Sequence, residues 1–295
     1  MKRFFTLALT GIILLAACGS DSGDQPTSTD SASPVSEVAA EPAGGSTKDC
    51  AAGKTISDGK LTIATGEPAF EPYVVGDKPE AGEGFEAAVA AAVASELGFD
   101  TATTKWTRTA FDAAIAPGPK DFDFNLQQYT ITEERKAAVD FSQGYYSAPQ
   151  AVFGLADSAA AGVKSVADLQ KLKIGVAAGT TSLTYAEETI KPESTVQVFN
   201  DNAAAKVALE SKQVDAIVAD LPTALYITAV EIEGTKVFGQ IAGSGTDEFG
   251  LLLAKGSALT ECVNLALGAL KSSGELDTIT AKWMSEYTSA PVIAG

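Results

Sequence analysis

The 295-residue chain contains no histidine, and this absence excludes several kinds of active site. Ser-His-Asp and Cys-His nucleophile systems need an imidazole as their base, and many zinc sites need one as a ligand. Basic residues are also scarce: 38 Asp and Glu stand against 21 Lys and Arg, a formal net charge of −17. This charge argues against nucleic acid or an anionic membrane surface as a partner. We expect no metal, no cofactor and no catalytic residues.

Apolar runs long enough to matter for membranes are confined to the first residues. A basic start, an apolar stretch and small residues before Cys18 follow the order of a secretory signal peptide, predicted here for residues 1–17. The sequence Leu-Ala-Ala-Cys18 resembles the bacterial lipobox, whose cysteine becomes the lipidated first residue of the mature protein. We therefore expect an exported lipoprotein, anchored by palmitate to the outer face of the bacterial cell membrane. An ordinary signal peptide cleaved elsewhere is the alternative.

Aromatic residues are absent from the segment that follows. Residues 19–48 are mostly Ser, Asp, Gly, Pro, Thr, Ala and Glu, so they cannot bury enough apolar surface to offset the entropy of ordering. Residues 18–49 are thus predicted to be a lipidated cysteine and a flexible tether. The rest of the chain, from about residue 50, is expected to be a soluble folded head with the membrane reached by the lipid alone.

The head alternates strand-like and helical patterns, which predicts an α/β fold. Phe85, Val89 and Val93 recur at four-residue spacing, as in an amphipathic helix. The order strand, loop, helix occurs twice, which fits two related lobes. The expected strands are 59–65, a segment ending near 106, 122–127, 172–177, 196–199, 214–220 and 249–255. The expected helices are 84–98, 111–115, 183–189, 202–210, 258–271 and 275–285.

Three features point to a site for a small charged molecule. Arg135 offers a planar donor fork that matches a carboxylate and stays charged at any working pH. The turn Gly179-Thr-Thr-Ser182 lies between a strand and a helix start, where free backbone N–H groups favour an anion. Asp220 ends an apolar strand, where ligands bind in open α/β sheets. Taken singly, these residues are equally a surface salt-bridging arginine, a helix N-cap and a turn-forming aspartate.

Their order and spacing resemble the polar amino-acid-binding proteins, the solute-capturing subunits of bacterial ABC importers, over roughly residues 57–287. The segments that carry the resemblance are Gly84-Phe85-Glu86, Thr130 to Tyr146, Gly179 to Ser182, and Asp220. The resemblance implies a two-lobed, periplasmic-binding-protein-like (type II) fold, with two mainly parallel sheets joined by a two-stranded hinge. The chain would cross near 147–150 and 251–254. Lobe 1 would then hold 50–148 plus 254–295, and lobe 2 would hold 149–253.

The resemblance also implies roles for ten residues. The ligand carboxylate would be held by Arg135, Thr180 and Thr181. The ligand ammonium would be held by Asp220, Thr130 and Gln128. The ligand side chain would pack against Phe70, Phe111, Glu67 and Gln127. The two glutamines stand where small residues are common in the family, and Glu67 favours a polar or basic ligand weakly.

The implied function is that of an extracytoplasmic solute-binding protein, a monomer that delivers a free amino acid to an ABC membrane permease. Three alternatives remain at this stage. The protein could be a sensor or adaptor that presents its ligand to a membrane receptor, a dehydratase-like enzyme on the same scaffold, or a binder of another acid such as a dicarboxylate or an opine.

Cysteines are few, and two of the three lie in the head. Two cysteines in an exported protein suggest one disulfide, here between Cys50 and Cys262. This bridge would tie the start of the head to a C-terminal helix. Two buried free thiols are the alternative.

Overall fold

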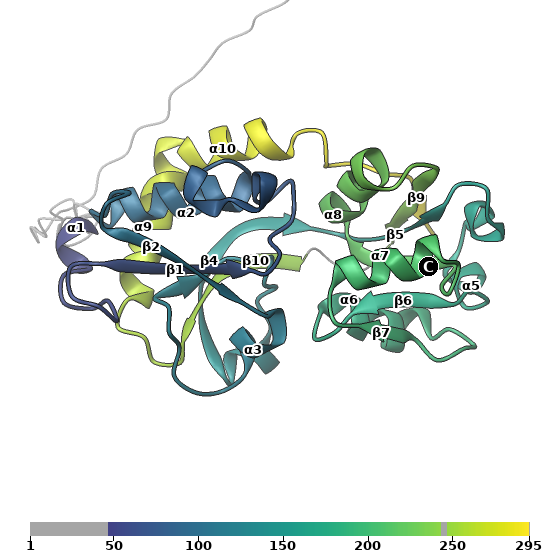
Figure 1. The fold of residues 1–295 in the computed structure, drawn as a ribbon, viewed down its shortest axis with the longest axis horizontal. Helices are drawn as coiled ribbons and strands as arrows, with labels where there is room; N and C mark the ends of the chain where they lie inside the picture. Colours follow the sequence, from purple (N-terminus) through teal and green to yellow (C-terminus); the bar gives the residue numbers. More distant parts are fainter. Residues whose placement is uncertain (1–46, 243–246, 295) are drawn as a thin grey trace, which may run out of the picture. The chain divides into compact units, whose positions relative to one another are not determined.

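The computed structural model describes residues 47–242 and 247–294, which belong to one compact unit. The predicted signal peptide, Cys18 and nearly all of the predicted tether lie outside the described residues. Within the described ranges, no helix combines the length and apolar character needed to cross a membrane. Two separate β-sheets organise this unit, and each has its own hydrophobic core (Figure 1).

The first sheet contains five strands in the order β2 (Thr104–Thr109), β1 (Leu61–Gly66), β3 (Phe124–Asn125), β10 (Asp247–Ala254) and β4 (Val139–Ala148). Strand β1 runs parallel to β2 and β3, whereas β10 runs antiparallel to β3 and β4. The helices of this lobe are α1 (Thr47–Cys50), α2 (Phe85–Glu96), α3 (Phe111–Ile115), α4 (Glu133–Lys136), α9 (Thr260–Ser273) and α10 (Glu275–Met284).

Helix α2 shows why the apolar spacing predicted it correctly. Phe85, Val89 and Val93 are all fully buried in the first core, together with residues of α9 and α10. The ring of Phe85 lies 5.0 Å from that of Tyr146, at an edge-to-face angle of 61°. Aromatic contacts of this kind add to the stabilisation that burial provides. The core of the first lobe is therefore built between α2 and the sheet.

The predicted disulfide is confirmed. Cys50, at the end of α1, is bonded to Cys262 in α9, with the two Cα atoms 5.6 Å apart. Cys262 is fully buried in the first core, and Cys50 packs against that core. The bridge thus joins both ends of the first lobe's sequence.

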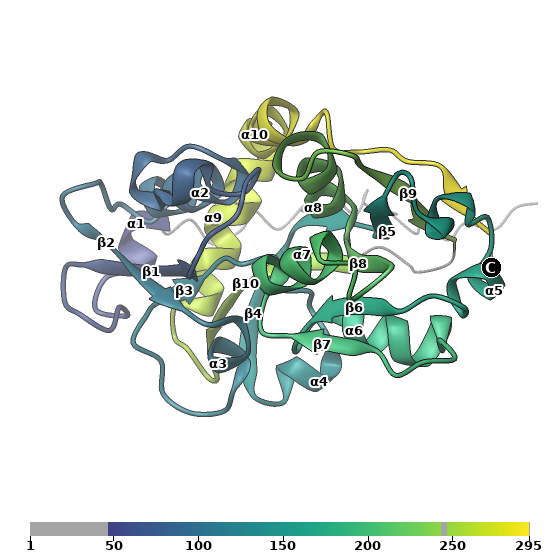
Figure 2. The same cartoon turned by 45° about the vertical axis from the view of Figure 1, so that its right-hand side comes forward.

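The second sheet contains six strands in the order β11 (Val292–Ile293), β9 (Thr235–Ile241), β5 (Gln150–Leu155), β8 (Ala216–Asp220), β6 (Ile174–Ala177) and β7 (Gln197–Phe199). Its helices are α5 (Val166–Leu169), α6 (Thr181–Tyr185), α7 (Asn202–Glu210) and α8 (Leu221–Tyr226). Helix α6 continues into the π-helical turn η4 (Ala186–Ile190), and α8 continues into η5 (Ile227–Glu231). Figure 2 shows α6 and α7 beside the β6 and β7 end of the sheet.

The sheets are mixed, not mainly parallel as predicted. Strand β5 pairs antiparallel with both β8 and β9, and β10 does the same with β3 and β4. Strands β5 and β10 each follow a crossing of the chain between the lobes, and each runs in the opposite direction to both of its neighbours. Because strand direction depends on where the chain arrives from, local periodicity does not reveal it.

The predicted return crossing at 251–254 is also wrong. These residues lie inside β10, which begins at Asp247 and belongs to the first sheet. Leu251 and Leu253 are buried in one core and Leu252 in another, as expected for a central strand covered on both faces. The crossing therefore precedes Asp247, and lobe 2 ends earlier than the predicted residue 253.

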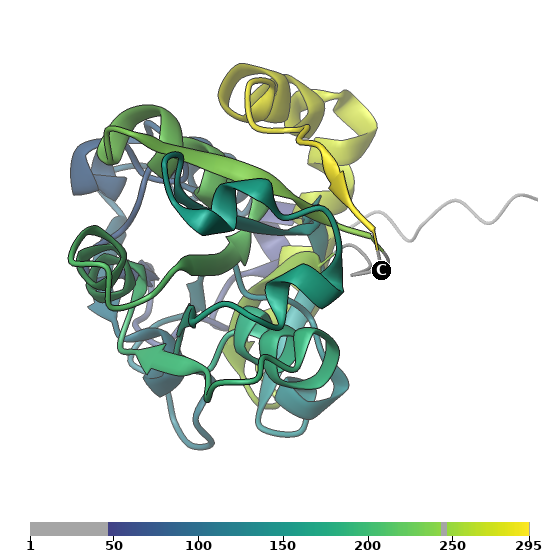
Figure 3. The same ribbon diagram turned by 90° about the vertical axis from the view of Figure 1, so that its right-hand side faces the viewer.

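A third crossing near the C-terminus was not predicted. Helix α10 packs in the first core through Leu276 and Met284, but the chain then reaches the second sheet, where β11 pairs parallel with β9. Ile293 is 1% exposed and belongs to a core of the second lobe. Figure 3 shows this last segment running from α10 to the end of the chain. Strand β11 therefore pairs with the second sheet, whereas residues 254–295 were all predicted to lie in lobe 1.

Candidate functional site

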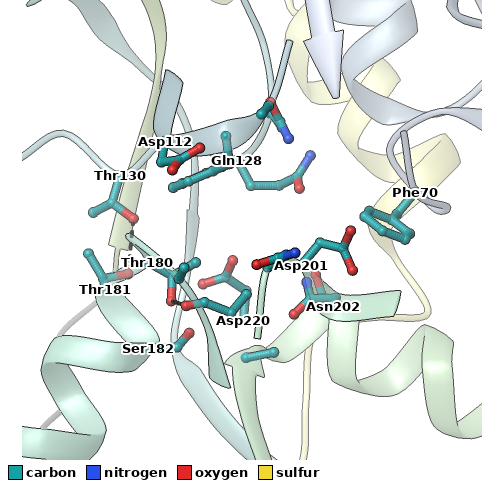
Figure 4. A pocket seen from close by; sticks show the side chains of 18 of the residues that line it. Phe70, Asp112, Gln128, Thr130, Thr180, Thr181, Ser182, Asp201, Asn202 and Asp220 are labelled. Atoms are coloured by element: carbon teal, nitrogen blue, oxygen red, sulfur yellow. Dashed lines mark hydrogen bonds between the residues drawn. The ribbon is translucent and has the colours of Figure 1, made fainter. Parts of the chain in front are cut away.

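All ten residues predicted from the sequence line a single pocket of about 310 Å³. The first lobe contributes Glu67, Phe70, Phe111, Gln127, Gln128, Thr130 and Arg135, and the second contributes Thr180, Thr181 and Asp220. Figure 4 shows Gln128 and Thr130 on one side of this pocket and Thr180 and Asp220 on the other. Residues far apart in the sequence thus meet between the two lobes, while their individual roles remain a proposal.

Arg135 is positioned by a short helix. The Thr132 side chain caps α4 by accepting a hydrogen bond from the Arg135 backbone N–H. Arg135 is 8% exposed, and its guanidinium donates to the carbonyl oxygens of Thr130 (2.7 Å) and Gly179 (2.9 Å). A guanidinium has five N–H donors, so three remain for another acceptor. Because Thr130 and Gly179 belong to different lobes, Arg135 joins the lobes directly.

The hydroxyl groups of the turn before α6 are already bonded within the protein, to both lobes. The Thr180 hydroxyl donates to the Ala177 carbonyl (2.8 Å) and accepts from the Leu183 N–H (3.2 Å), so its only proton is already committed. The Thr181 hydroxyl donates to a carboxylate oxygen of Asp247 (2.5 Å). Within this turn, the backbone N–H groups at the start of α6 are the donors that remain for an anion in the pocket. Gly179 reaches this turn with a φ of 69°, a conformation that favours glycine.

Asp220 stands at the carboxyl end of β8, directly before α8, whose first turn contains Pro222. One oxygen of its carboxylate accepts a hydrogen bond from the Gln150 amide (2.8 Å). Burial, and next the nearby Asp247 carboxylate, raise the pKa of Asp220 to about 8. A cation in the pocket would reverse this effect, because an opposite charge favours the ionised carboxylate.

Gln128 is held from behind by a buried acid. Its backbone N–H donates to one Glu86 carboxylate oxygen (2.7 Å), and its side-chain amide donates to the other. Glu86 is 1% exposed and also accepts from the Tyr145 hydroxyl. Gln128 has a φ of 52°, which is uncommon for a side chain other than glycine. One amide N–H is thus committed to Glu86, and the side-chain oxygen is left to accept a hydrogen bond.

The buried carboxyl of Glu86 also has a perturbed pKa. Burial raises the pKa of its carboxyl to about 7, although hydrogen bonds from Tyr145 and Gln128 oppose the shift. The sequence pattern Gly84-Phe85-Glu86 contributed to the family resemblance. It did not indicate that Glu86 would lie beneath the pocket.

The predicted aromatic residues are both at the pocket, each with another partner. The Phe111 ring stacks on Tyr129 with centroids 4.7 Å apart, and the Arg135 guanidinium carbon lies 5.4 Å from the Phe111 centroid. The Lys206 ammonium lies 5.6 Å from the Phe70 ring centroid. Gln127 is oriented by Tyr129, whose hydroxyl donates to the Gln127 amide oxygen (2.9 Å). The amide nitrogen of Gln127 is therefore its free end.

Several lining residues were not identified from the sequence, including Asp112, Asp201, Asn202 and Thr223. Asp201 follows β7 and caps α7 by accepting from the Ala204 N–H (2.8 Å). It therefore lies at the carboxyl end of a strand, and the positional rule that identified Asp220 would have found it. Figure 4 shows Asp201 and Asn202 on the side of the pocket that faces Phe70.

The lobes also contact each other at the edge of the pocket. The Tyr73 hydroxyl lies 3.2 Å from the Thr223 hydroxyl, and Tyr226 donates to a Glu71 carboxylate oxygen (2.8 Å). Together with the bond from Arg135 to Gly179, these contacts hold the two lobes in a closed arrangement. Burial is the largest cause that raises the pKa of Tyr226, and the Glu71 carboxylate adds to it.

The chemistry available in this pocket is that of paired opposite charges. Arg135 and the N-terminus of α6 favour an anion, whereas Asp220 and the side-chain oxygen of Gln128 favour a cation. A molecule carrying both charges can satisfy both groups at once. Among the residues described, no group of three or more acids and cysteines is placed to hold a metal ion.

Comparison with known proteins identifies similar chains. The model of the bacterial extracellular solute-binding proteins, family 3, matches residues 61–286. The sequence is 32% identical to the ABC transporter glutamine-binding protein GlnH of Bacillus subtilis (strain 168), over 97% of this chain and 98% of that one. Among solved structures, an ancestral arginine-binding protein bound to glutamine is 34% identical, with a TM-score of 0.67, over 77% of this chain and 98% of that one. The ancestral amino acid-binding protein AncCDT-1, a precursor of cyclohexadienyl dehydratase, is 32% identical, with a TM-score of 0.66, over 76% of this chain and 95% of that one.

Proposed function

Because this chain belongs to family 3 of the bacterial extracellular solute-binding proteins, we propose that its pocket captures a free α-amino acid and delivers it to an ABC permease. The observation that carries this proposal is that Arg135 and Asp220 reach one pocket from opposite lobes. Similarity to a glutamine-binding protein of an ABC transporter supports the same role.

The ligand's carboxylate pairs with the free guanidinium donors of Arg135 and with the backbone N–H groups of Thr181 and Ser182. Its ammonium pairs with Asp220 and with the oxygens of Gln128 and Thr130. Each buried charge must be paired, since an unpaired one would cost more than the contacts return. This requirement selects molecules that carry both charges on one carbon.

Thr180 and Thr181 act in this scheme through their backbones. The Thr180 hydroxyl is committed to Ala177 and the Thr181 hydroxyl to Asp247. A carboxylate has no proton to give, so it cannot share these hydroxyl groups without breaking a bond within the protein. The N–H groups at the helix start need no such exchange.

The side chain of the ligand is polar or basic. Glu67 and Asp201 line the pocket, as does Gln127, whose amide oxygen already accepts from Tyr129. Phe70 and Phe111 provide apolar surface for the aliphatic part of the ligand. Glutamine and arginine, the ligands named for similar proteins, are the first candidates.

Ligand binding favours closure because both lobes contact the ligand only in the closed arrangement. The closed head then docks on the permease as a monomer. Cys18 carries the lipid that keeps the protein at the outer face of the cell membrane, and the segment after it acts as the tether.

We assign no catalysis to this pocket, although an ancestral relative is named as the precursor of a dehydratase. Turnover separates the two functions. The purified head is incubated with each ligand it binds, and the ligand is recovered and identified by mass spectrometry. Recovery of the unchanged amino acid supports capture, and a dehydrated product would assign an enzyme.

Calorimetric titration of the purified head against the twenty amino acids and a set of dicarboxylates tests the proposal. We expect micromolar or tighter binding of a polar or basic amino acid and loss of that binding in Arg135→Met. Binding of a dicarboxylate in place of every amino acid would refute it.

A further inference from the structure

Gln150 is a buried glutamine that contacts the pocket only through other residues. It is the first residue of β5, directly after the chain crosses into the second lobe, and it is 1% exposed. Its amide nitrogen donates to Asp220 (2.8 Å) and to Asp247 (2.9 Å), while its amide oxygen accepts from the Ser182 hydroxyl (2.6 Å). Both N–H donors and one acceptor position of this side chain are therefore committed.

The two carboxylates that Gln150 joins come from different parts of the chain. Asp220 ends β8 in the second lobe, and Asp247 begins β10 in the first sheet. Asp247 also accepts the hydroxyl proton of Thr181, at the start of α6. Gln150 thus lies between the acid at the pocket and the turn that begins α6.

We propose that Gln150 is a positioning residue that orients the Asp220 carboxylate toward the ammonium group of the ligand. The proposal rests on the function proposed above. By holding one oxygen of Asp220, the amide leaves the other free to face the pocket. Register supports this role, because Gln150 and Asp220 are direct partners across β5 and β8.

The physical need for such a residue comes from the two negative charges. Asp220 and Asp247 lie close together in a buried region, where like charges repel more strongly than in water. An amide with one N–H directed at each carboxylate separates and stabilises both. The pKa of Asp220 supports the same reading, because its bond with Gln150 opposes the rise that burial and Asp247 cause. Gln150 therefore favours the ionised Asp220 that an ammonium requires.

The variant Gln150→Met tests the role, since methionine is unbranched and of similar length but donates no hydrogen bond. Affinity is measured calorimetrically for L-glutamine and L-arginine, and for their analogues without the α-ammonium, 4-carbamoylbutanoate and 5-guanidinopentanoate. We expect the variant to lose about 10- to 100-fold in affinity for the amino acid that the wild type binds. We expect less than a threefold change for the matching analogue, which does not contact Asp220 through an ammonium.

A matched control is Gln143→Met. Gln143 lies in β4, where its amide bonds to Asn264 and not to the pocket, so both affinities should remain unchanged. Should Gln150→Met not fold, Ser182→Ala removes the hydroxyl that orients the Gln150 amide. It should give the same selective loss for the amino acid, smaller in size.

The outcomes separate the two proposals. An equal loss for the amino acid and its analogue, or no loss for either, overturns the role of Gln150. If the wild type binds no amino acid at all, the proposed function fails instead.

Discussion

Replacing Glu86 with glutamine should flatten the dependence of stability on pH. Burial raises the pKa of the Glu86 carboxyl from its ordinary 4.5 to about 7. The folded protein then binds this proton more tightly than the unfolded chain does. For such a group, stability is greatest below the unfolded-state pKa and falls as pH rises toward the folded-state value. Stability is therefore lost between about pH 4.5 and pH 7.

The size of the effect follows from the shift. Each pKa unit corresponds to about 1.4 kcal/mol, so the free energy of unfolding falls by about 3 kcal/mol over this whole pH range. Urea denaturation of the ligand-free head at pH 5 and pH 8 measures most of it. The free energy of unfolding of the wild type should fall by about 2 to 3 kcal/mol more than that of Glu86→Gln. Asp220, whose pKa is about 8, titrates in both proteins and largely cancels from the difference, because the Glu86 charge is the smallest of the causes that raise its pKa.

Tyr145→Phe provides the matched control. It removes a hydroxyl that donates to Glu86 and stabilises the charged carboxylate. The pKa of Glu86 should therefore rise further, and the fall in stability should extend to higher pH. If wild type and Glu86→Gln lose the same stability between pH 5 and pH 8, burial does not hold Glu86 in its protonated form and the reasoning is wrong.

Three other perturbations have defined outcomes. Arg135→Met should abolish amino-acid binding in calorimetry. It should also lower the ligand-free melting temperature, since two hydrogen bonds from a buried guanidinium are lost. An unchanged affinity would exclude a role of Arg135 in binding the ligand. Tyr226→Phe removes the hydrogen bond to Glu71 and should weaken ligand affinity about two- to fivefold by destabilising the closed arrangement. Glu71→Gln, which keeps an acceptor, should change the affinity less. Replacing both Cys50 and Cys262 with serine should lower the free energy of unfolding by about 2–5 kcal/mol, with reductant reproducing the loss in the wild type and having no effect on the variant.

The predicted elements that matched the structure are those with strong local patterns. Helix α2 has apolar residues at four-residue spacing, and helices α3 and α7 were predicted with their observed limits. Strand β3 was predicted over 122–127 but includes only Phe124 and Asn125. Asp123 is instead used for hydrogen bonds from the backbone of Ile56 and Thr62. Such interruptions depend on partners distant in the sequence.

Strands β4, β5 and β9 were not predicted as strands, although β5 and β9 lie inside the second sheet and β4 forms one edge of the first. In β4 the polar residues Ser142 and Gln143 break the alternation, because their side chains bond to the backbone and to a neighbouring helix. Strand β11 is only two residues long and is defined by its pairing with β9. None of these features leaves a periodic signal.

The membership of the site was more predictable than its bonding. All ten predicted residues line the pocket. The commitment of the Thr180 and Thr181 hydroxyls to Ala177 and Asp247 depends on rotamers and on contacts across the fold. Gln150 shows the same limit, since a single glutamine at the start of a strand gives no sign of two carboxylates 70 and 97 positions away.

The third crossing has a mechanical consequence. Two connections would allow the lobes to twist against each other as well as to bend, whereas a third connection, from α10 to β11, restrains the twist. Ile293 anchors this connection, since its side chain fits against Gly239, where a larger residue would leave no room. We therefore expect the lobes to open along one path, which would bring Arg135 and Asp220 back into the same alignment each time they close.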